Sequence, residues 1–245
     1  MTHTVALRWA TDLLFPRPCA GCDTPLPTGR PGEFCTVCTM ALPWLRAPIC
    51  AVCGDAFQVS ASQDAGAFAE RTCLRCREDR PKFSVARAAF RYTGPARQAV
   101  HRLKFDGRKA LGPGLADLML DGLGPEVTTD LDLVIPVPLH PDRSRERGYN
   151  QAEVLATRLA ARLARPLAPR ALLRVRATPP QVGLDRPARL ANLRDAFAPG
   201  PDPVAGRDLL LVDDVLTTGA TGSACARTLL AAGAARVRLA AFARD

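Results

Sequence analysis

Two adjacent carboxylates and a short loop rich in hydroxyl groups occur together in the segment LLLVDDVLTTGAT, residues 209–221. Asp213 and Asp214 follow an apolar run that is typical of a buried strand, and ligands bind at the C-terminal ends of strands in open α/β sheets. The loop then leads into an expected helix. Its successive backbone N–H groups and the positive end of the helix dipole form an anion site suited to a phosphate monoester. The residues expected to hold this phosphate are Thr217, Thr218, Gly219, Ala220 and Thr221.

Carboxylates beside a phosphate require a reason, because like charges repel. Vicinal sugar hydroxyls supply one, since a carboxylate accepts their hydrogens, and Mg²⁺ supplies another. The segment therefore favours a phosphate, a ribose diol and Mg²⁺ around one loop. A strand ending in two solvated aspartates is the simpler alternative. A nucleotide-binding P-loop is not indicated, because Gly107 and Gly112 have the glycine spacing of that motif but Pro113 follows them.

Eight of the nine cysteines form four C-x-x-C pairs within residues 17–80. In a reducing compartment such pairs favour zinc over disulfides, and closed Cys₄ sites are structural. Sequential pairing of neighbouring motifs is the simplest arrangement, and interleaved pairing remains open. The expected ligands of two zinc ions are Cys19, Cys22, Cys35, Cys38, Cys50, Cys53, Cys73 and Cys76. The ninth, Cys225, lies among alanines and is interpreted as a small buried core residue.

The elements that must position these residues alternate between strands and helices from about residue 83 onward. Apolar runs predict strands at 83–92, 131–138, 171–175, 208–214 and 235–243. Helices are expected at 94–104, at 109–122, after an N-cap at Asn150, and at 221–232. This alternation predicts an α/β fold with a parallel sheet flanked by helices. We expect residues 1–82 to form an N-terminal helix, at 4–15, and a double zinc module, and residues 83–245 to form the α/β domain.

Four segments resemble known families. The acidic pair, Thr-Thr-Gly and Thr221 resemble the phosphoribosyl diphosphate motif of type I phosphoribosyltransferases. Residues 135–152, IPVPLHPDRSRERGYNQA, resemble the V-P-V-P-L-H-P-x-R and R-G-[FY]-N-Q-A pattern of the ComF family, also called the competence-protein or amidophosphoribosyltransferase-like family. Residues 181–197 and 91–107 are similar to two further patterns of that family. The resemblance extends over nearly the whole chain.

The resemblance implies a type I phosphoribosyltransferase fold that binds 5-phosphoribosyl 1-diphosphate with Mg²⁺ and transfers the phosphoribosyl group to an unidentified acceptor. Asp213 and Asp214 would hold the ribose hydroxyls, and Lys104 would lie near the diphosphate. Arginine makes bidentate contacts with such groups, and residues 181–197 look like a mobile hood loop that excludes water. The diphosphate contacts are expected from Arg143, Arg147 and Gly148, and the hood residues are Gln181, Arg189 and Asn192. His140 either shapes its loop or acts as a general acid–base.

The family's association with DNA uptake leaves a second hypothesis, a non-catalytic binding or sensing module that contacts single-stranded DNA or a helicase-like competence partner. The formal charge of +9 suits polyphosphate or nucleic acid, but no block of lysines and arginines marks a basic arm. The aromatic residues of the cysteine module form no obvious stacking platform for bases. No apolar run is long enough to cross a membrane and no signal peptide is evident, so we expect a cytoplasmic protein without membrane insertion. The acceptor and the oligomeric state stay open.

Overall fold

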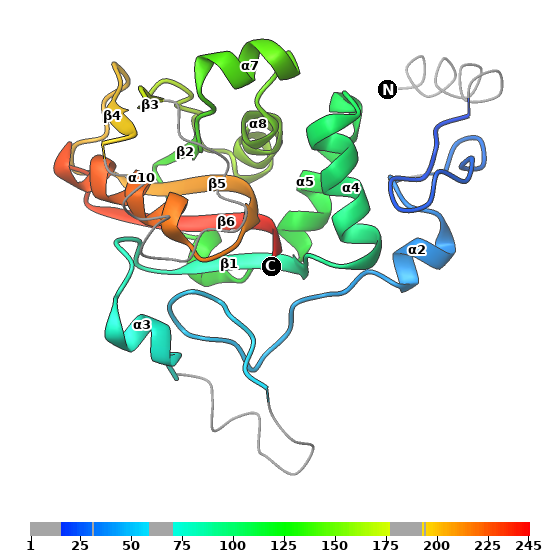
Figure 1. Cartoon of the computed structure of the whole chain (residues 1–245), viewed down its shortest axis with the longest axis horizontal. Coiled ribbons are helices and arrows are strands. Elements are labelled where there is room, and N and C mark those ends of the chain that lie inside the picture. The colour runs from blue at the N-terminus through cyan, green and yellow to red at the C-terminus, as the bar shows by residue number, and fades with distance from the viewer. Residues whose placement is uncertain (1–15, 31, 59–70, 177–192, 194) are drawn as a thin grey trace.

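A four-stranded parallel sheet forms the centre of the molecule (Figure 1). The structure, a computed structural model, describes residues 16–30, 32–58, 71–176, 193 and 195–245. The strand order is β1 (Ala86–Arg91), β6 (Arg236–Arg244), β5 (Asp208–Leu216) and β2 (Leu133–Pro136), and all three pairings are parallel. This confirms the predicted fold class and the strands at 83–92, 131–138, 208–214 and 235–243.

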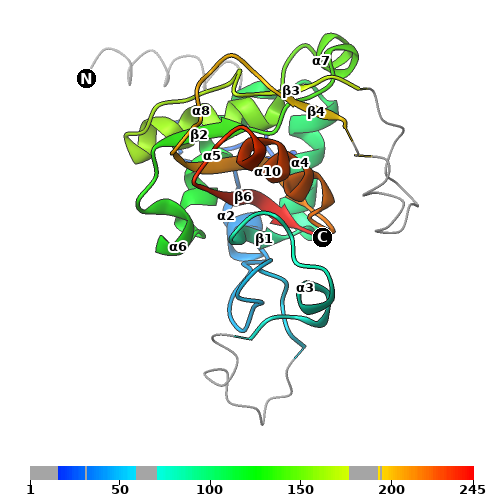
Figure 2. The same cartoon turned by 90° about the vertical axis from the view of Figure 1, so that its left-hand side faces the viewer.

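Helices cover both faces of the sheet, which explains the continuous apolar runs of its strands. Side chains alternate across a strand, so Leu209 and Leu211 join the cluster formed with α10 (Ala220–Ala231), whereas Leu210 and Val212 join the cluster on the other face. That second cluster includes residues of α4 (Gly94–Phe105), α5 (Gly112–Asp121) and α8 (Gln151–Leu163). Figure 2 shows α10 on one side of the sheet and α5 and α8 on the other.

The helix boundaries follow from local signals. Asn150 is the N-cap of α8, as predicted, because its side-chain oxygen accepts a hydrogen bond of 3.0 Å from the Ala152 N–H. The helix expected at 109–122 is divided into a short 3₁₀ turn, η2 (Lys109–Leu111), and α5, with Pro113 in the first turn of α5. Proline suits a first turn because it lacks the N–H that has no partner there.

Three sequence expectations about local structure differ from the observed fold. The strand predicted at 171–175 forms as β3 (Leu172–Arg174), but it pairs antiparallel with β4 (Phe197–Pro199) in a separate two-stranded sheet. The arginine-rich segment interpreted as a loop contains α7 (Pro141–Arg147), capped by His140. The strand predicted at 208–214 continues to Leu216 as β5, so the acidic pair is followed by two further strand residues.

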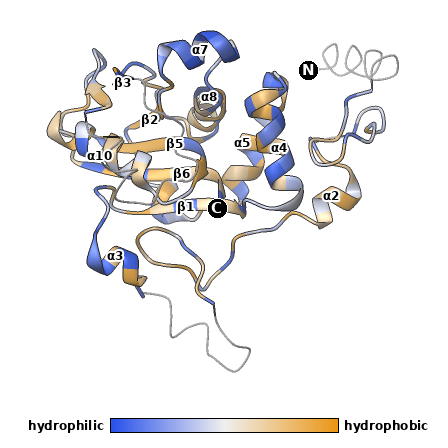
Figure 3. Ribbon diagram, viewed as in Figure 1, coloured by the Kyte–Doolittle hydropathy of each residue, from blue (hydrophilic) through white to orange (hydrophobic). Residues whose placement is uncertain are grey.

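The N-terminal module packs against the edge of the sheet formed by β1. It contains α2 (Thr36–Met40) and α3 (Leu74–Glu78), and a further short helix, α6 (Pro125–Thr128), precedes β2. Both hydrophobic clusters contain residues of the module as well as of the sheet, and Trp44 bridges to Phe90 of β1 with ring centroids 4.4 Å apart. Figure 3 shows hydrophobic residues concentrated in the strands and hydrophilic ones along α7.

Two expectations fall outside the described residues: the helix at 4–15, and the hood residues Gln181, Arg189 and Asn192. Within the described part of the chain, none of the helices combines the length and the apolar character needed to cross a membrane.

Candidate functional site

The acidic pair and Lys104 form a charged group near the C-terminal end of β5, in which Asp214 is buried and Asp213 and Lys104 are half-buried. Asp214 is only 3% exposed, and its Oδ1 lies 2.8 Å from Lys104 Nζ at the end of α4. The Asp214 N–H donates to Asp213 Oδ1 at 2.8 Å. The second oxygen of Asp214, Oδ2, is buried and has no hydrogen-bond partner among the described residues. A buried acceptor without a donor costs about 1–3 kcal/mol, so a ligand hydroxyl or a cation at Oδ2 would be stabilising.

Burial and mutual repulsion govern the charges of this group. Burial raises the pKa of Asp213 to about 7, and the neighbouring charge of Asp214 adds to the increase. Burial alone would lower the pKa of Lys104, but its attraction to Asp214 and their hydrogen bond raise that pKa above its ordinary value. Lys104 therefore stays a cation at neutral pH, whereas Asp213 changes its charge near neutrality.

A cavity of about 420 Å³ opens over this group, a size within the usual range of small-molecule sites. Sequence-predicted residues that line it are Lys104, Asp213, Asp214, Thr217 and Thr221. Gly219, with φ of 80°, is the N-cap of α10 and allows the turn that brings the threonines to the cavity. The Thr218 hydroxyl instead accepts a hydrogen bond of 3.3 Å from the Ala220 N–H.

The residues of α7 lie apart from the lining of this cavity. Arg147 donates to Gln151 Oε1 at 2.5 Å and its guanidinium lies 5.3 Å from the centre of the Phe105 ring. Gly148, with φ of 78°, ends α7 and lines a neighbouring cavity of about 640 Å³. Arg143 is close enough to Arg174 to help lower the pKa of that arginine, although burial is the larger cause. His140 caps α7 through its imidazole, which accepts from the Asp142 N–H.

Four polar residues of the cavity wall were not predicted from the sequence: Tyr92, Gln151, Arg174 and Asp245. Arg174, at the end of β3, and Gln151, at the start of α8, both line it. The positive charge of Arg174 also opposes the increase in the pKa of Asp213. A signal for Arg174 was present, because an arginine inside the apolar run ALLRV requires a partner or a ligand.

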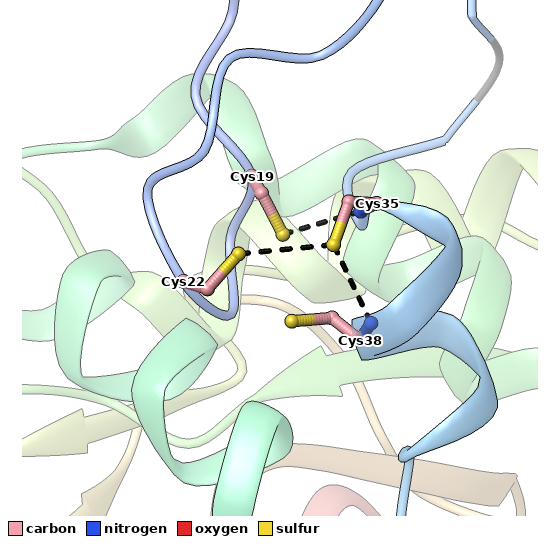
Figure 4. Close-up of side chains that lie close together, drawn as sticks. All are labelled: Cys19, Cys22, Cys35 and Cys38. Carbon is pink, nitrogen blue, oxygen red and sulfur yellow. Dashed lines mark hydrogen bonds between the residues drawn. The ribbon is translucent and has the colours of Figure 1, made fainter.

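The eight paired cysteines form two clusters in which the four sulfur atoms lie within 4.8 Å of one another. The grouping is sequential, Cys19, Cys22, Cys35 and Cys38 in one cluster (Figure 4) and Cys50, Cys53, Cys73 and Cys76 in the other. A tetrahedral zinc with Zn–S bonds of 2.3 Å separates its sulfurs by about 3.8 Å, and the Cys22–Cys35 and Cys53–Cys73 sulfurs are both 3.7 Å apart. Backbone N–H groups also point at these sulfurs. The donor sets therefore fit zinc.

A buried arginine connects each cysteine cluster to the wall of the cavity. Arg102 of α4, 7% exposed, donates to the backbone carbonyls of Cys19 and Ala20 and to Asp23. It precedes Lys104 by two residues.

Arg244 of β6, 5% exposed, donates to the Cys53 carbonyl at 2.9 Å and to Asp55 at 3.1 Å. The next residue, Asp245, lines the cavity. Helix α4 and strand β6 therefore each carry an arginine that contacts a cysteine cluster. In each case a residue of the cavity wall lies one or two positions further along the chain.

Comparison with known proteins shows relatives along most of the chain. Residues 10–77 match the double zinc ribbon domain. The DNA utilization protein YhgH of Salmonella typhimurium is 35% identical over 215 residues, which cover 84% of this chain and 94% of that protein. Competence protein F of Haemophilus influenzae is 31% identical over 203 residues, 80% of this chain and 85% of that protein.

Among solved structures, a purine phosphoribosyltransferase from Pyrococcus horikoshii Ot3 matches 59% of this chain and 72% of its own, with 17% identity and a TM-score of 0.32. At that TM-score the likeness carries no argument about activity.

Proposed function

The chain belongs to the ComF family, with competence protein F and YhgH among its members, and we propose that it binds 5-phosphoribosyl 1-diphosphate together with Mg²⁺ and transfers the phosphoribosyl group to an acceptor. The observation that carries this proposal is the Asp213–Asp214–Lys104 group, which opens into a cavity beside the threonine loop. Residues 1–82 and 83–245 are proposed as the zinc-binding and donor-binding parts of the chain.

The cavity offers a partner for each portion of the donor. The loop from Thr217 to Thr221 would hold the 5′-phosphate through its N–H groups and hydroxyls. Asp213 and the free oxygen of Asp214 would accept the two ribose hydroxyls. The diphosphate and this acidic pair offer the oxygen ligands that Mg²⁺ prefers, and a bound ion would neutralise charge on the leaving group.

The positive side chains around the cavity suit the departure of a diphosphate. As the bond from the anomeric carbon to the diphosphate breaks, negative charge grows on the leaving oxygens, and a cation placed there in advance stabilises that charge. Lys104 and Arg174 line the cavity and supply this positive charge. The acceptor then forms its bond to the same carbon.

Calorimetric titration of the zinc-loaded chain with the donor and Mg²⁺ tests the proposal. We expect saturable binding by the wild type and at least about tenfold weaker binding by the Asp213→Asn/Asp214→Asn double variant, because an amide offers the hydroxyls one acceptor oxygen where a carboxylate offers two. Asp202→Asn is the matched control, since Asp202 pairs with Arg170 outside the donor cavity.

Two outcomes would contradict the donor site. Either the folded wild type shows no binding, or the double variant binds as tightly as the wild type.

Donor affinity should depend on pH through Asp213. Because burial raises the pKa of this carboxyl to about 7, it is largely protonated at pH 6 and ionised at pH 8. The ionised form accepts hydroxyl hydrogens better, so affinity should increase across this range. The sign is opposite for stability: a carboxyl whose pKa is raised on folding contributes stability at low pH, and that contribution is lost as the pH increases towards 7.

The measurement is the donor Kd of the wild type and of Asp213→Asn between pH 6 and 8. The diphosphate titrates identically in both experiments, so the difference between the two profiles reports Asp213. Parallel profiles would show that Asp213 does not titrate in this range.

Contact with single-stranded DNA or a helicase-like partner is the second candidate function. The names of the relatives favour a role in DNA utilization or competence. Exposed arginines on α7, and a cavity of about 690 Å³ beside the second cysteine cluster with Arg77 and Arg80 in its wall, supply positive charge for a polyanion. If the folded wild type does not bind the donor, contact with single-stranded DNA or a helicase-like partner becomes the preferred proposal.

A further inference from the structure

We propose that Phe105, with Arg147 over its ring, is a stacking site for a nucleobase at the edge of the donor cavity. The interpretation of this site as the place where an acceptor binds rests on the proposed function, whereas the stacking itself does not. The inference names a chemical class for the ligand: a planar nitrogen heterocycle that carries a phosphate, as a free nucleotide or as part of a single strand.

Phe105 differs from the other exposed apolar residues in its neighbours. It ends α4 and is 63% exposed, although Leu103 two residues earlier is fully buried. The His101 ring lies 4.9 Å from the Phe105 ring, and the Arg147 guanidinium lies 5.3 Å from the same ring. An exposed aromatic face next to an arginine is the combination that binds bases in single-stranded nucleic acids.

Two routes connect Phe105 to the donor cavity. Along the chain, it directly follows Lys104, whose ammonium pairs with Asp214 inside the cavity. Across space, the Arg147 side chain that covers its ring also donates to Gln151, and Gln151 lines the cavity. A base stacked on Phe105 would therefore lie beside the donor site, where an acceptor has to be.

The charge around Phe105 suits a ligand that carries phosphate. Arg97, His101 and Phe105 are spaced by four residues, so they follow one exposed stripe of α4. On α7, Arg143 and Arg145 are exposed next to Arg147. Acidic groups are also present, since Asp106 faces His101 at 3.8 Å and Asp142 pairs with Arg145. Arg97, Arg143 and Arg147 have no acidic partner among the ion pairs of the described residues.

The test uses the full zinc-loaded chain and two probes, a fluorescently labelled oligodeoxyadenylate followed by anisotropy, and unlabelled dAMP as competitor. Phe105→Leu keeps an apolar side chain but removes the aromatic face, and Phe105→Trp enlarges that face. Met40→Ala is the control, because Met40 is an exposed apolar residue on α2, distant in sequence from the site. Thermal unfolding of each variant checks the fold.

We expect Phe105→Leu to weaken oligonucleotide binding about tenfold, the loss of one base stack, whereas Phe105→Trp binds at least as tightly as the wild type and Met40→Ala binds equally. If the Kd of dAMP from competition equals the Kd of the oligonucleotide, the ligand is a free nucleotide. Tighter, salt-dependent oligonucleotide binding identifies a single strand.

The inference is overturned if Phe105→Leu binds like the wild type, or if the wild type binds neither probe. A parallel titration of the wild type with the donor is judged separately. If the wild type binds the donor but Phe105→Leu has no effect on oligonucleotide binding, the stacking site is rejected and the donor site is retained. If the wild type does not bind the donor but Phe105→Leu weakens oligonucleotide binding, only the donor site is rejected.

Discussion

Removal of zinc should unfold the cysteine-rich module and lower the thermal stability of the whole chain. The module has few core residues of its own, and structural zinc binding contributes about 10–16 kcal/mol to folding in small zinc domains. The destabilisation caused by zinc removal should extend to the α/β domain. Arg102 and Arg244 donate to backbone carbonyls of the two cysteine clusters, and a buried charge that loses its partners costs about 3–5 kcal/mol.

The measurement is zinc content per chain together with the melting temperature before and after chelation. Cys22→Ser and Cys53→Ser each remove one ligand from a different cluster, so each should bind about half the zinc of the wild type. Cys225→Ala is the control, because this buried cysteine belongs to neither cluster. An unchanged melting temperature after complete loss of zinc would show that the metal does not support the fold.

Lys104→Met should be the most damaging single substitution at the candidate site. Methionine fills a similar volume but leaves Asp214, which is almost completely buried, without its cation. The expected loss is about 3 kcal/mol in the free energy of unfolding, measured by urea denaturation at pH 8. Donor affinity should fall as well, because one of the positive charges in the cavity is lost.

Two further variants test whether the loss of stability comes from the unpaired Asp214 carboxylate. Lys104→Arg keeps the charge and should recover most of the stability. Adding Asp214→Asn to Lys104→Met removes the buried carboxylate and should cost less than the sum of the two single substitutions, since the residues interact directly. Additive effects in this double-mutant cycle would contradict a direct interaction.

The central strand and its loop could be predicted from the sequence because their signals are local. Thirteen residues contain the apolar run before Asp213 and Asp214, the threonine loop and Gly219. The run forms the strand, and Gly219 allows the turn that leads into α10. Sequential cysteine grouping was the simplest arrangement of the four motifs, and the structure has this grouping. The N-cap at Asn150 likewise depends only on its neighbours.

Other features depended on contacts that a sequence pattern does not encode. Helix α7 has no apolar periodicity, so its only signals were Pro141 at the start and Gly148 at the end. The pairing of β3 with β4 joins residues about 25 positions apart along the chain. Arginine is usually exposed, so the sequence alone does not indicate that Arg102 and Arg244 are buried against the cysteine clusters. Phe105 is apolar, but it lies on the exposed stripe of α4 with Arg97 and His101 rather than in the core.

The pairing of Arg102 with Asp23, and of Arg244 with Asp55, joins each half of the zinc-binding module to the α/β domain through one carboxylate. A zinc ribbon exchanged from a distant relative would bring its own carboxylates, and these would have to match the spacing of two guanidiniums that it did not evolve with. A mismatch would leave a buried arginine with backbone carbonyls as its partners and no opposite charge, which should lower the stability of the exchanged chain. An exchanged ribbon should therefore support the fold best when it places carboxylates where Asp23 and Asp55 meet Arg102 and Arg244.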